Sequence, residues 1–310
     1  MTQNKSNKRY LLSRSIPMYF LLIPGFLLIL VFHYAPMFGL MIAFKDFNLF
    51  GGSSPVMAMF ESKWIGLSNF ADLFGLSQFR DALRNTFAIS FLKLIIGFPV
   101  PIILALLVNE INGKLIKRVV QTTLYLPHFM SWVIIAALFK SIFGTGGVVN
   151  ALIVSLGGKV QRFFMDNFWF RWLLLVTDIW KESGWGTIVY LAAITGIDPQ
   201  LYEAAKIDRA NRLQQIWHVT LPGIASTVVM MLILRLGGLM DAGFGQVLAM
   251  YNPTVYQTGD IIGTYIYRTG LGQLNFSRGT TVGLFNSLVS FVLVMSGNVF
   301  SRKLSGKSIW

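Results

Sequence analysis

Long apolar stretches are the feature that most constrains how this chain can fold. A helix rises about 1.5 Å per residue, so about 20 apolar residues in a row cross the hydrocarbon core of a bilayer. Stretches of this length recur along the sequence, with approximate bounds of 17–44, 83–108, 119–143, 170–194, 223–245 and 280–300. The expected fold class is therefore all-α, a polytopic membrane protein with six transmembrane helices.

The composition supports a membrane protein and excludes several other classes. Hydrophobic residues make up 54% of the chain and charged residues only 13%, whereas a soluble domain carries roughly 25% charged residues. The net charge of +13 lies mostly in loops and tails, where membrane topology explains it without a nucleic-acid partner. The chain lacks cysteine, and His33, His128 and His218 share no ligand spacing, so no disulfide and no metal site is predicted. No H-E-x-x-H or G-x-S-x-G motif is present, and no catalytic residue is predicted.

Basic residues also indicate how the chain crosses the membrane. With six spans, both termini lie on one side, together with the loops 109–118 and 195–222. Lys and Arg are denser in these segments than in the longer opposite loops, which favours cytoplasmic termini. The predicted organisation is a basic cytoplasmic N-tail at 1–15, a membrane domain at 16–301 that includes the polar loop 195–222, and a cytoplasmic C-tail at 302–310.

The polar loop 195–222 carries the densest ordered pattern in the chain. Asp198 is a good helix N-cap, and Pro199 follows at the first helical position, where its missing N–H costs nothing. One face of the expected helix carries Leu201, Ala204, Ala205 and Asp208. Asn211 is expected to cap a second short helix. The loop therefore predicts two short helices with a shallow docking face at the membrane surface.

The same loop resembles the EAA loop of permeases from ATP-binding-cassette (ABC) importers. The resemblance lies in Glu203-Ala204-Ala205, Asp208-Arg209-Ala210, Ile216 and Leu221-Pro222. It implies a type I ABC-importer permease fold, in which this loop docks into a cleft of a cytoplasmic ATPase. The residues that it assigns to ATPase coupling are Leu201, Glu203, Ala204, Ala205, Asp208, Arg209, Ala210, Ile216, Leu221 and Pro222. Arg209 stands where the family has Gly. If the turn keeps a positive φ, Arg209 bears a strain of about 1 kcal/mol. Otherwise the turn differs, or Arg209 makes a polar contact to the ATPase.

Further motifs resemble the subfamily that imports oligosaccharides through lipoprotein receptors. They are Asp178-Ile179-Trp180-Lys181, Gly184-Trp185-Gly186, Tyr251-Asn252-Pro253 and the ending Ser301-Arg302-Lys303-Leu304-Ser305-Gly306. The resemblance implies a multi-pass permease in a bacterial cytoplasmic membrane, which is not itself an enzyme. The implied partners are a second, related permease in a heterodimer, two ATPase subunits, an extracytoplasmic solute-binding protein and the lipid bilayer. ATP and Mg²⁺ would bind the ATPase subunits, and no cofactor is expected on this chain.

Polar residues inside the predicted spans are candidates for a translocation path. A charge at the bilayer centre costs at least about 2.5 kcal/mol, so such residues face water, a partner or one another. The candidates are Lys93, Asp178, Glu182, Trp185, Arg235 and Asp241.

Two interpretations of these candidates stay open. One is hydrogen bonding to sugar hydroxyls, and the other is structural pairing between helices. Both apply equally to Arg235, whereas pairing is favoured for Asp178 and Glu182. A sharper hypothesis pairs Lys93 or Arg235 with an anionic sugar such as a uronate.

Three other functions also stay open beside a carbohydrate importer. An ABC permease for a non-sugar solute would share the same loop. An ion-coupled transporter would not need the loop, and internal repeats of spans, which are usual in that class, are not clear here. An intramembrane enzyme could place a metal on Asp198, Glu203 and Asp208, but on a continuous helix each carboxylate is turned about 140° from the one before. An importer permease, with an oligosaccharide as the expected substrate, accounts for most of the pattern.

Overall fold

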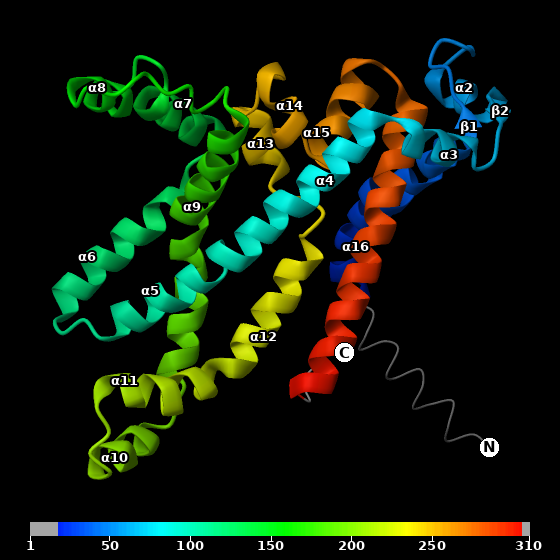
Figure 1. Ribbon diagram of the computed structural model, residues 1–310. Coiled ribbons are helices and arrows are strands. Elements are labelled where there is room, and N and C mark those ends of the chain that lie inside the picture. Colours follow the sequence, from blue (N-terminus) through cyan, green and yellow to red (C-terminus); the bar gives the residue numbers. More distant parts are fainter. Residues whose placement is uncertain (1–17, 306–310) are drawn as a thin grey trace, which may run out of the picture. The chain divides into compact units, whose positions relative to one another are not determined.

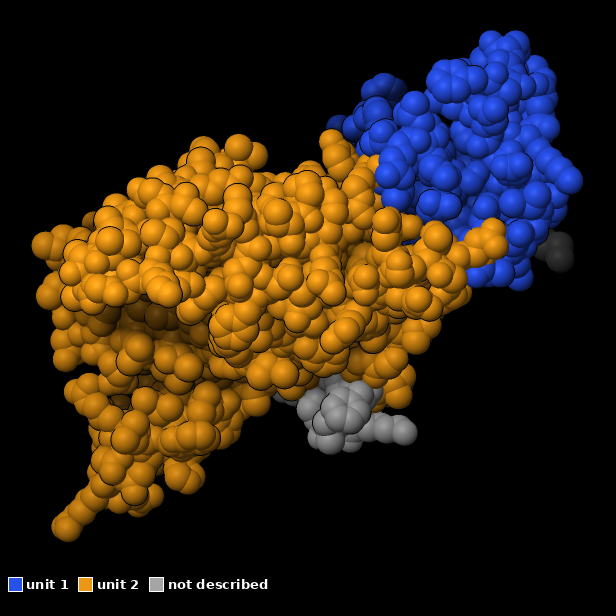
Figure 2. Space-filling model, turned by 45° about the horizontal axis from the view of Figure 1, so that its top comes forward, with its two compact units in different colours: residues 1–71, 269–284 blue, residues 72–268, 285–310 orange. Residues whose placement is uncertain are grey.

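The computed structural model describes residues 18–305. The described chain forms two compact units, which Figure 2 colours separately. Unit 1 comprises the described residues up to Ala71 together with Thr269–Leu284, and unit 2 comprises Asp72–Arg268 and the described residues from Phe285 on. The all-α prediction is confirmed, because apart from two strands of two residues each the regular structure of the described chain is helical.

Unit 1 contains the first apolar helix and a small ribbon. The helix at 18–29 continues through η1 (Leu30–Tyr34) into η2 (Ala35–Phe44). Strand β1 (Lys45–Asp46) then pairs antiparallel with β2 (Lys63–Trp64), on either side of α2 (Pro55–Glu61). The buried Lys45 donates from Nζ to the carbonyls of Met59 and Phe60, each at 2.8 Å. Because a buried ammonium needs such acceptors, this side chain ties the ribbon to α2.

Helices make up unit 2. Helix α3 (Ser68–Gly75) leads into it, and α16 (Phe276–Ser305) returns to it. Between them the elements are α4 (Ser77–Leu92), η3 (Lys93–Gly97), α5 (Pro99–Asn109), α6 (Lys114–Tyr125), η4 (Leu126–Phe129), α7 (Trp132–Phe143), α8 (Val148–Ser155), α9 (Asn167–Thr195), α10 (Pro199–Ile207), α11 (Arg212–Gln215), η5 (Ile216–Thr220), α12 (Leu221–Gly237), α13 (Phe244–Met250), η6 (Pro253–Val255), α14 (Tyr256–Gly259), α15 (Ile262–Ile266) and η7 (Tyr267–Gly272), whose residues from Thr269 on belong to unit 1.

Helix α9 is the axis of unit 2. Its 29 residues extend over about 43 Å at 1.5 Å per residue. Asp166 caps its start by accepting hydrogen bonds from the backbone N–H groups of Phe168 and Trp169. Gly184 lets another segment approach closely, since a Cβ there would lie 1.9 Å from the Leu124 carbonyl oxygen. In Figure 1, α9 runs from the end of the unit that holds α7, α8 and α13 to the end that holds α10 and α11.

Two apolar clusters pack along this axis. One joins α7, α9 and α13 through residues such as Phe139, Phe170 and Val247, and the other joins α5, α9 and α12 through residues such as Tyr190 and Ile224. The polar residues in the middle of α9 lie between the parts of the helix that contribute to these two clusters. The packing therefore leaves the centre of α9 available for polar chemistry.

Five helical stretches of the described chain are long and apolar enough to cross a membrane, judged by length and composition: Met18–Phe44, Ser77–Asn109, Trp132–Ser155, Arg212–Gly237 and Phe276–Val299. Helix α9, which contains the predicted span 170–194, is not among them, because Arg171, Asp178, Lys181 and Glu182 interrupt its apolar run. A total of six spans and cytoplasmic termini therefore stay predictions. The predicted N-tail 1–15 lies outside the described residues, and of the predicted C-tail 302–310 only 302–305 are described, as the last turn of α16.

Two predicted spans differ from the helices observed. The span 119–143 is not one helix: α6 ends at Tyr125, Pro127 lies in the 3₁₀ turn η4, and Ser131 caps α7. Proline removes a helical N–H and so favours such a break. The span 223–245 ends early, because α12 stops at Gly237 and Ala242 has a left-handed φ of 50°. This early end matters because it places Asp241 in a turn rather than on α12.

Candidate functional site

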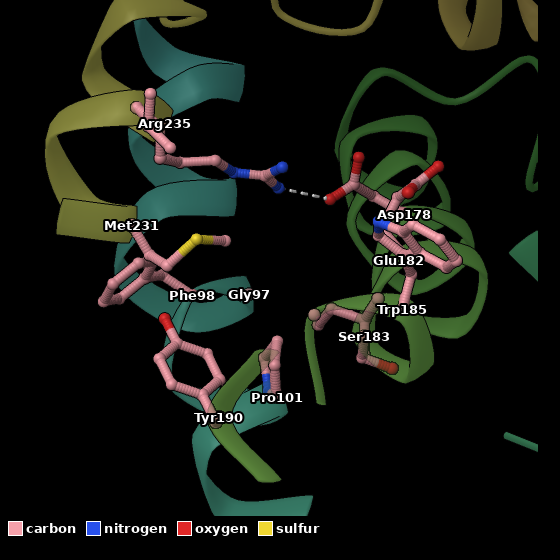
Figure 3. Close-up of a pocket in the computed structure, with 13 residues that line it drawn as sticks. Gly97, Phe98, Pro101, Asp178, Glu182, Ser183, Trp185, Tyr190, Met231 and Arg235 are labelled. Atoms are coloured by element: carbon pink, nitrogen blue, oxygen red, sulfur yellow. Dashed lines mark hydrogen bonds and ion pairs between the residues drawn. The ribbon is translucent and has the colours of Figure 1, made fainter. Parts of the chain in front are cut away.

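Asp178, in the middle of α9, is the centre of a buried ion-pair cluster. Its Oδ1 lies 3.0 Å from Lys93 Nζ, and its Oδ2 lies 3.0 Å from Arg235 Nη2. Figure 3 shows how Arg235 reaches across from α12 to this carboxylate. The side chains of Lys93 and Asp178 are only 6% and 9% exposed, whereas that of Arg235 is 41% exposed. One carboxylate therefore pairs with two cations, of which Arg235 is much more exposed than Lys93.

The surroundings of Lys93 explain its burial. Its Nζ donates to the Ala242 carbonyl at 3.1 Å and to Oε1 of the buried Gln246. Gln246 is held in turn, because its Nε2 donates to the Leu174 carbonyl at 2.7 Å. Gly243 has a φ of 84°, and a Cβ there would lie 2.6 Å from Lys93 Nζ. The turn after α12 thus needs glycine both for its backbone conformation and for the space that the ammonium occupies.

A second polar group lies one turn further along α9. Glu182 Oε2 is 2.9 Å from His128 Nδ1, and the His128 ring stacks on Trp185 with centroids 4.7 Å apart. Lys181 lies 3.8 Å from Glu182 Oε1 and donates to the carbonyl of Met130 at 2.9 Å. The break at Pro127 is what brings His128 to this position, since it turns the chain of α6 towards α9.

Two adjoining cavities open onto these residues. The first has a volume of about 250 Å³ and is walled by Trp185, Tyr190 and Met231 among others, as Figure 3 shows. The second, of about 320 Å³, is lined by Lys93 and Asp241 among others. Both are lined by Asp178, Glu182, Leu234 and Arg235.

The structure brings all six predicted path residues to these two cavities. Lys93, Asp178, Glu182, Arg235 and Asp241 line the second, and Trp185 joins three of them at the first. Asp241 is exposed and points back to its own turn, where its Oδ1 accepts a 3.4 Å hydrogen bond from the Phe244 N–H. Sequence reasoning missed His128 and Gln246 as neighbours of these residues. Pro127 was the only nearby residue that pointed to the position of His128, and no nearby residue pointed to that of Gln246.

Helices α10 and α11 form where the loop 195–222 predicts them. Asp198 Oδ1 accepts a hydrogen bond from the Gln200 N–H at 2.9 Å. At the second helix, Asn211 and Gln214 form a reciprocal capping box, which satisfies two backbone donors. The expected caps of both helices are therefore confirmed.

Arg209 has a left-handed backbone, with a φ of 57°. The Ala210 N–H donates to the Ala205 carbonyl at 2.9 Å, and the Arg209 N–H to the Lys206 carbonyl at 3.0 Å. This pair of bonds is a Schellman motif, whose left-handed position is usually glycine. The turn therefore keeps the geometry that a glycine would adopt, and Arg209 bears a strain of about 1 kcal/mol.

The two loop helices are anchored on one side and exposed on the other. Tyr202 Oη lies 3.0 Å from Thr220 Oγ1, and Arg212 Nη1 lies 2.5 Å from Glu110 Oε2. The residues assigned to coupling divide accordingly: Leu201, Glu203, Ala204, Asp208, Arg209 and Pro222 are exposed, and Ala205, Ala210, Ile216 and Leu221 are half-buried. The outward surface can therefore receive a partner without unfolding the loop.

The ion-pair cluster and the loop helices share the same two supports. Helix α9 leads into α10, and α12 leads out of η5. Asp178 lies 17 residues before the end of α9, and Arg235 lies 14 residues after the start of α12, which places the ion pair roughly 20–25 Å along the helices from the loop. The Asp178–Arg235 ion pair therefore joins the two helices that frame the loop.

Known proteins resemble this chain in sequence and in fold. Residues 97–307 match the family described as binding-protein-dependent transport system inner membrane component. The polygalacturonan/rhamnogalacturonan transport system permease protein YteP of Bacillus subtilis (strain 168) is 45% identical over 294 residues, which cover 94% of this chain and 90% of that protein.

Two solved structures show the same fold over nearly the whole chain. One is a bacterial alginate ABC transporter in complex with an alginate pentasaccharide-bound periplasmic protein, with a TM-score of 0.87, 39% identity, and coverage of 96% of this chain and 98% of that chain. The other is a bacterial ABC transporter involved in the import of the acidic polysaccharide alginate, with a TM-score of 0.88, 40% identity, and coverage of 96% and 99%.

Proposed function

Because the chain belongs to the family of binding-protein-dependent transport system inner membrane components and is a permease subunit of an ABC transporter, we propose that it carries an acidic oligosaccharide. The names of the relative YteP and of the alginate transporter refer to polymers that contain acidic sugars. The uronate units of such polymers each bear a carboxylate among their hydroxyls. The residues around the two central cavities have the chemistry to bind both groups.

The main support for this proposal is the environment of Arg235. Its guanidinium has five N–H donors, and its contact with Asp178 uses one of them. The carboxylate that it contacts is shared with Lys93, so the positive charge of Arg235 is only partly balanced there. Glu182 and Asp241 also line the cavities, so recognition of an anion depends on Arg235 itself rather than on a net positive wall. A planar guanidinium suits bidentate contact with a carboxylate.

Lys93 has a different role in this proposal. It is buried and surrounded by Asp178, Gln246 and the Ala242 carbonyl. An ammonium held by three acceptors holds helices together rather than meeting substrate. Of the two cations in the uronate hypothesis, the proposal therefore keeps Arg235 and assigns Lys93 to positioning Asp178.

The proposed assembly follows the family. A second, related permease completes the path, two ATPase subunits carrying ATP and Mg²⁺ dock on α10 and α11, and an extracytoplasmic binding protein delivers the sugar. The periplasmic protein in the alginate transporter complex supports the last of these partners. In this arrangement the membrane is the bacterial cytoplasmic membrane, α9 is a sixth span, and both termini are cytoplasmic.

Transport in this proposal is alternating access driven from the loop. Closure of the ATPase subunits moves α10 and α11, and because α9 and α12 continue from that loop, the movement reaches the Asp178–Arg235 contact. Glu203, which is exposed, makes a polar contact with the ATPase. Asp208, the C-cap residue of α10, holds the turn whose left-handed residue is Arg209.

The test is ATPase activity and uptake in proteoliposomes that hold this chain, its partner permease and the ATPase subunits. Binding protein loaded with tri-galacturonate, an alginate trisaccharide or neutral maltotriose is added in turn. We expect stimulation by the acidic sugars, and loss of stimulation with Glu203→Ala and Ala204→Trp in complexes that still assemble. Stimulation by maltotriose alone would overturn the acidic substrate, and failure of any ATPase subunit to bind would overturn the role of the loop.

A further inference from the structure

A third cavity lies at the end of unit 2 away from α10 and α11. Its volume is about 290 Å³, close to the lower end for ligand pockets. Its walls come from the end of α7, the turn at 162–165 before α9, and the residues 250–252 after α13. It shares no lining residue with the two central cavities. We call it the α7–α13 cavity.

The charged residues of this cavity are both basic. They are Lys140 on α7 and Arg162 in the turn before α9, and both are exposed. Within residues 18–299, whose side chains the structure describes, neither forms an ion pair. The described hydrogen bond of Lys140 is a long one, 3.5 Å from Nζ to the Ala249 carbonyl. The nearest carboxylate in sequence, Asp166, is engaged at the start of α9. The cavity therefore offers two cations and no lining carboxylate.

Aromatic side chains form the rest of its wall. Phe143, Phe163, Phe164 and Tyr251 line it. Burial, followed by the neighbouring Tyr256, raises the pKa of Tyr251 to about 12, so its hydroxyl stays protonated. Aromatic faces beside fixed polar groups are the usual composition of a small-ligand site.

The walls are fixed before any ligand arrives. The buried Asn150 donates from Nδ2 to the Gly144 and Gln161 carbonyls at 2.8 and 2.9 Å and accepts from the Gln161 N–H at 2.7 Å. On the other side, Asn252 Nδ2 donates to the Phe164 carbonyl at 2.8 Å. The rings of Phe143 and Phe163 pack edge to face at 5.5 Å. A site fixed in this way loses little entropy when it binds.

The position of the cavity along α9 suggests its place in transport. It adjoins the start of α9, whereas Asp178 is 11 residues after Asn167, or roughly 17 Å further along the helix. The loop helices follow after the far end of α9, about 43 Å from its start. If the loop faces the ATPase, the α7–α13 cavity faces the side from which sugar is delivered, and Arg235 lies between the two.

We propose that the α7–α13 cavity is a first binding site for a uronate unit of the incoming oligosaccharide. Lys140 and Arg162 bind its carboxylate, and the aromatic wall contacts the C–H face of the ring. This inference rests on the proposed function. A second source of the same anionic chemistry is the headgroup of an acidic lipid, and the test separates the two.

The test compares Lys140→Gln, Arg162→Gln and their double variant with wild type in the complete reconstituted transporter. Lys159→Gln is the matched control, since it removes an exposed cation from the same loop without lining the cavity. The readout is the concentration of tri-galacturonate-loaded binding protein that gives half-maximal ATPase activity, together with uptake of the sugar. The affinity of the transporter for unloaded binding protein is measured in parallel.

The double variant is expected to raise the half-maximal concentration roughly three- to tenfold, as losses of up to about 1 kcal/mol for each exposed charge pair imply. The maximal rate, the affinity for unloaded binding protein and the behaviour of Lys159→Gln should not change. An unchanged half-maximal concentration, or an equal loss of affinity for unloaded binding protein, would overturn the inference. So would an effect that disappears in vesicles of uncharged lipid, because it would assign the cations to an acidic headgroup.

Failure of the proposed function looks different. In that case wild type itself shows no response to tri-galacturonate or to the alginate trisaccharide, and both proposals are lost together. A wild-type response with no change in the double variant removes only the first binding site. Arg235→Gln is the reference for loss of charge at the central cavities, because it leaves Lys140 and Arg162 in place.

Discussion

The central cluster and the α7–α13 cavity adjoin the same helix, yet their cations lie in opposite environments. At the centre, Lys93 is 6% exposed and paired with Asp178 at 3.0 Å. At the start of α9, Lys140 and Arg162 are exposed and line a cavity without a carboxylate. A charge buried among apolar helices persists only with a partner, so its first effect is structural. An exposed charge at the rim of a cavity does not need a partner within the protein, so it can contact a ligand.

Arg235 is paired, as Lys93 is, and also exposed, as Lys140 and Arg162 are. One of its N–H groups holds Asp178, and its side chain is still 41% exposed. The comparison therefore predicts that removing charge from the centre changes stability, removing it from the α7–α13 cavity changes ligand affinity, and removing Arg235 changes mainly transport. The following substitutions test these three outcomes, beginning with the largest expected effect.

Asp178→Asn should have the largest effect on stability. It leaves the buried Lys93 without its carboxylate, which costs about 3–5 kcal/mol when one partner of a buried pair is removed. A fall in the thermal unfolding temperature of the purified permease complex measures it. Lys93→Met combined with Asp178→Leu removes both partners and should recover much of the loss, and equal destabilisation by the single and double changes would contradict a pairing role.

Gly243→Ala should disturb the same cluster from the backbone side. The alanine has to adopt a φ of 84°, and its Cβ would lie 2.6 Å from Lys93 Nζ. The left-handed conformation alone costs about 1–2 kcal/mol, and displacement of the ammonium adds to this. Gly238→Ala, in the same turn but with no atom closer than 3.8 Å to the added Cβ, is the control. Similar unfolding temperatures for the two variants would show that Gly243 does not position Lys93.

Arg235→Gln should weaken transport more than it weakens the fold. Lys93 still balances Asp178 in this variant, whereas the charged contact to substrate is lost. A hydrogen bond to a charged group contributes about 1.5–3 kcal/mol, so uptake of tri-galacturonate should fall about tenfold or more. Arg235→Lys keeps the charge without the planar fork and should recover only part of it. Equal uptake of acidic sugar by wild type and Arg235→Gln would remove Arg235 from the substrate path.

Arg209→Gly isolates backbone strain from charge burial. Arg209 is exposed and has a φ of 57° in the turn after α10, so glycine should stabilise the turn by up to about 1 kcal/mol. Hydrogen exchange of the α10 backbone measures this locally. Slower exchange would confirm the strain, and faster exchange would mean that the Arg209 side chain holds the turn. Comparison of Arg209→Gly with Gly243→Ala shows how much of the destabilisation in Gly243→Ala comes from the left-handed φ alone.

Lys140→Gln and Arg162→Gln should leave stability nearly unchanged. Both side chains are exposed and lack an ion pair among the described residues, and surface changes of this kind usually stay within about 0.5 kcal/mol. The unfolding temperature of the double variant should match that of Lys159→Gln. A clear loss of stability would mean that these cations support the fold, and the contrast with Lys93 would then be lost.

Much of the architecture followed from patterns within a few residues of each other. Apolar runs predicted the membrane helices, and the caps Asp198 and Asn211 predicted where α10 and α11 begin. The resemblance left the geometry of the turn at Arg209 open, and the structure shows the left-handed conformation that strains it. The interruption of α6 and α7 at Pro127 was not foreseen, since a proline in an apolar run is compatible with either a kink or a break.

The sequence by itself determined that the long apolar segments are mainly helical, which of them carry charge, and how the loop helices are capped, because hydrogen bonding and periodicity act over three to five residues. Only the tertiary structure decided what each charge does. Arg235 and Asp178 are 57 residues apart, and Lys93 meets Gln246 across 153 residues. Whether a cation is buried and paired or exposed and free to bind depends on which helices pack around it. That packing separates Lys93, which is buried and paired, from Arg235, Lys140 and Arg162, whose side chains stay exposed.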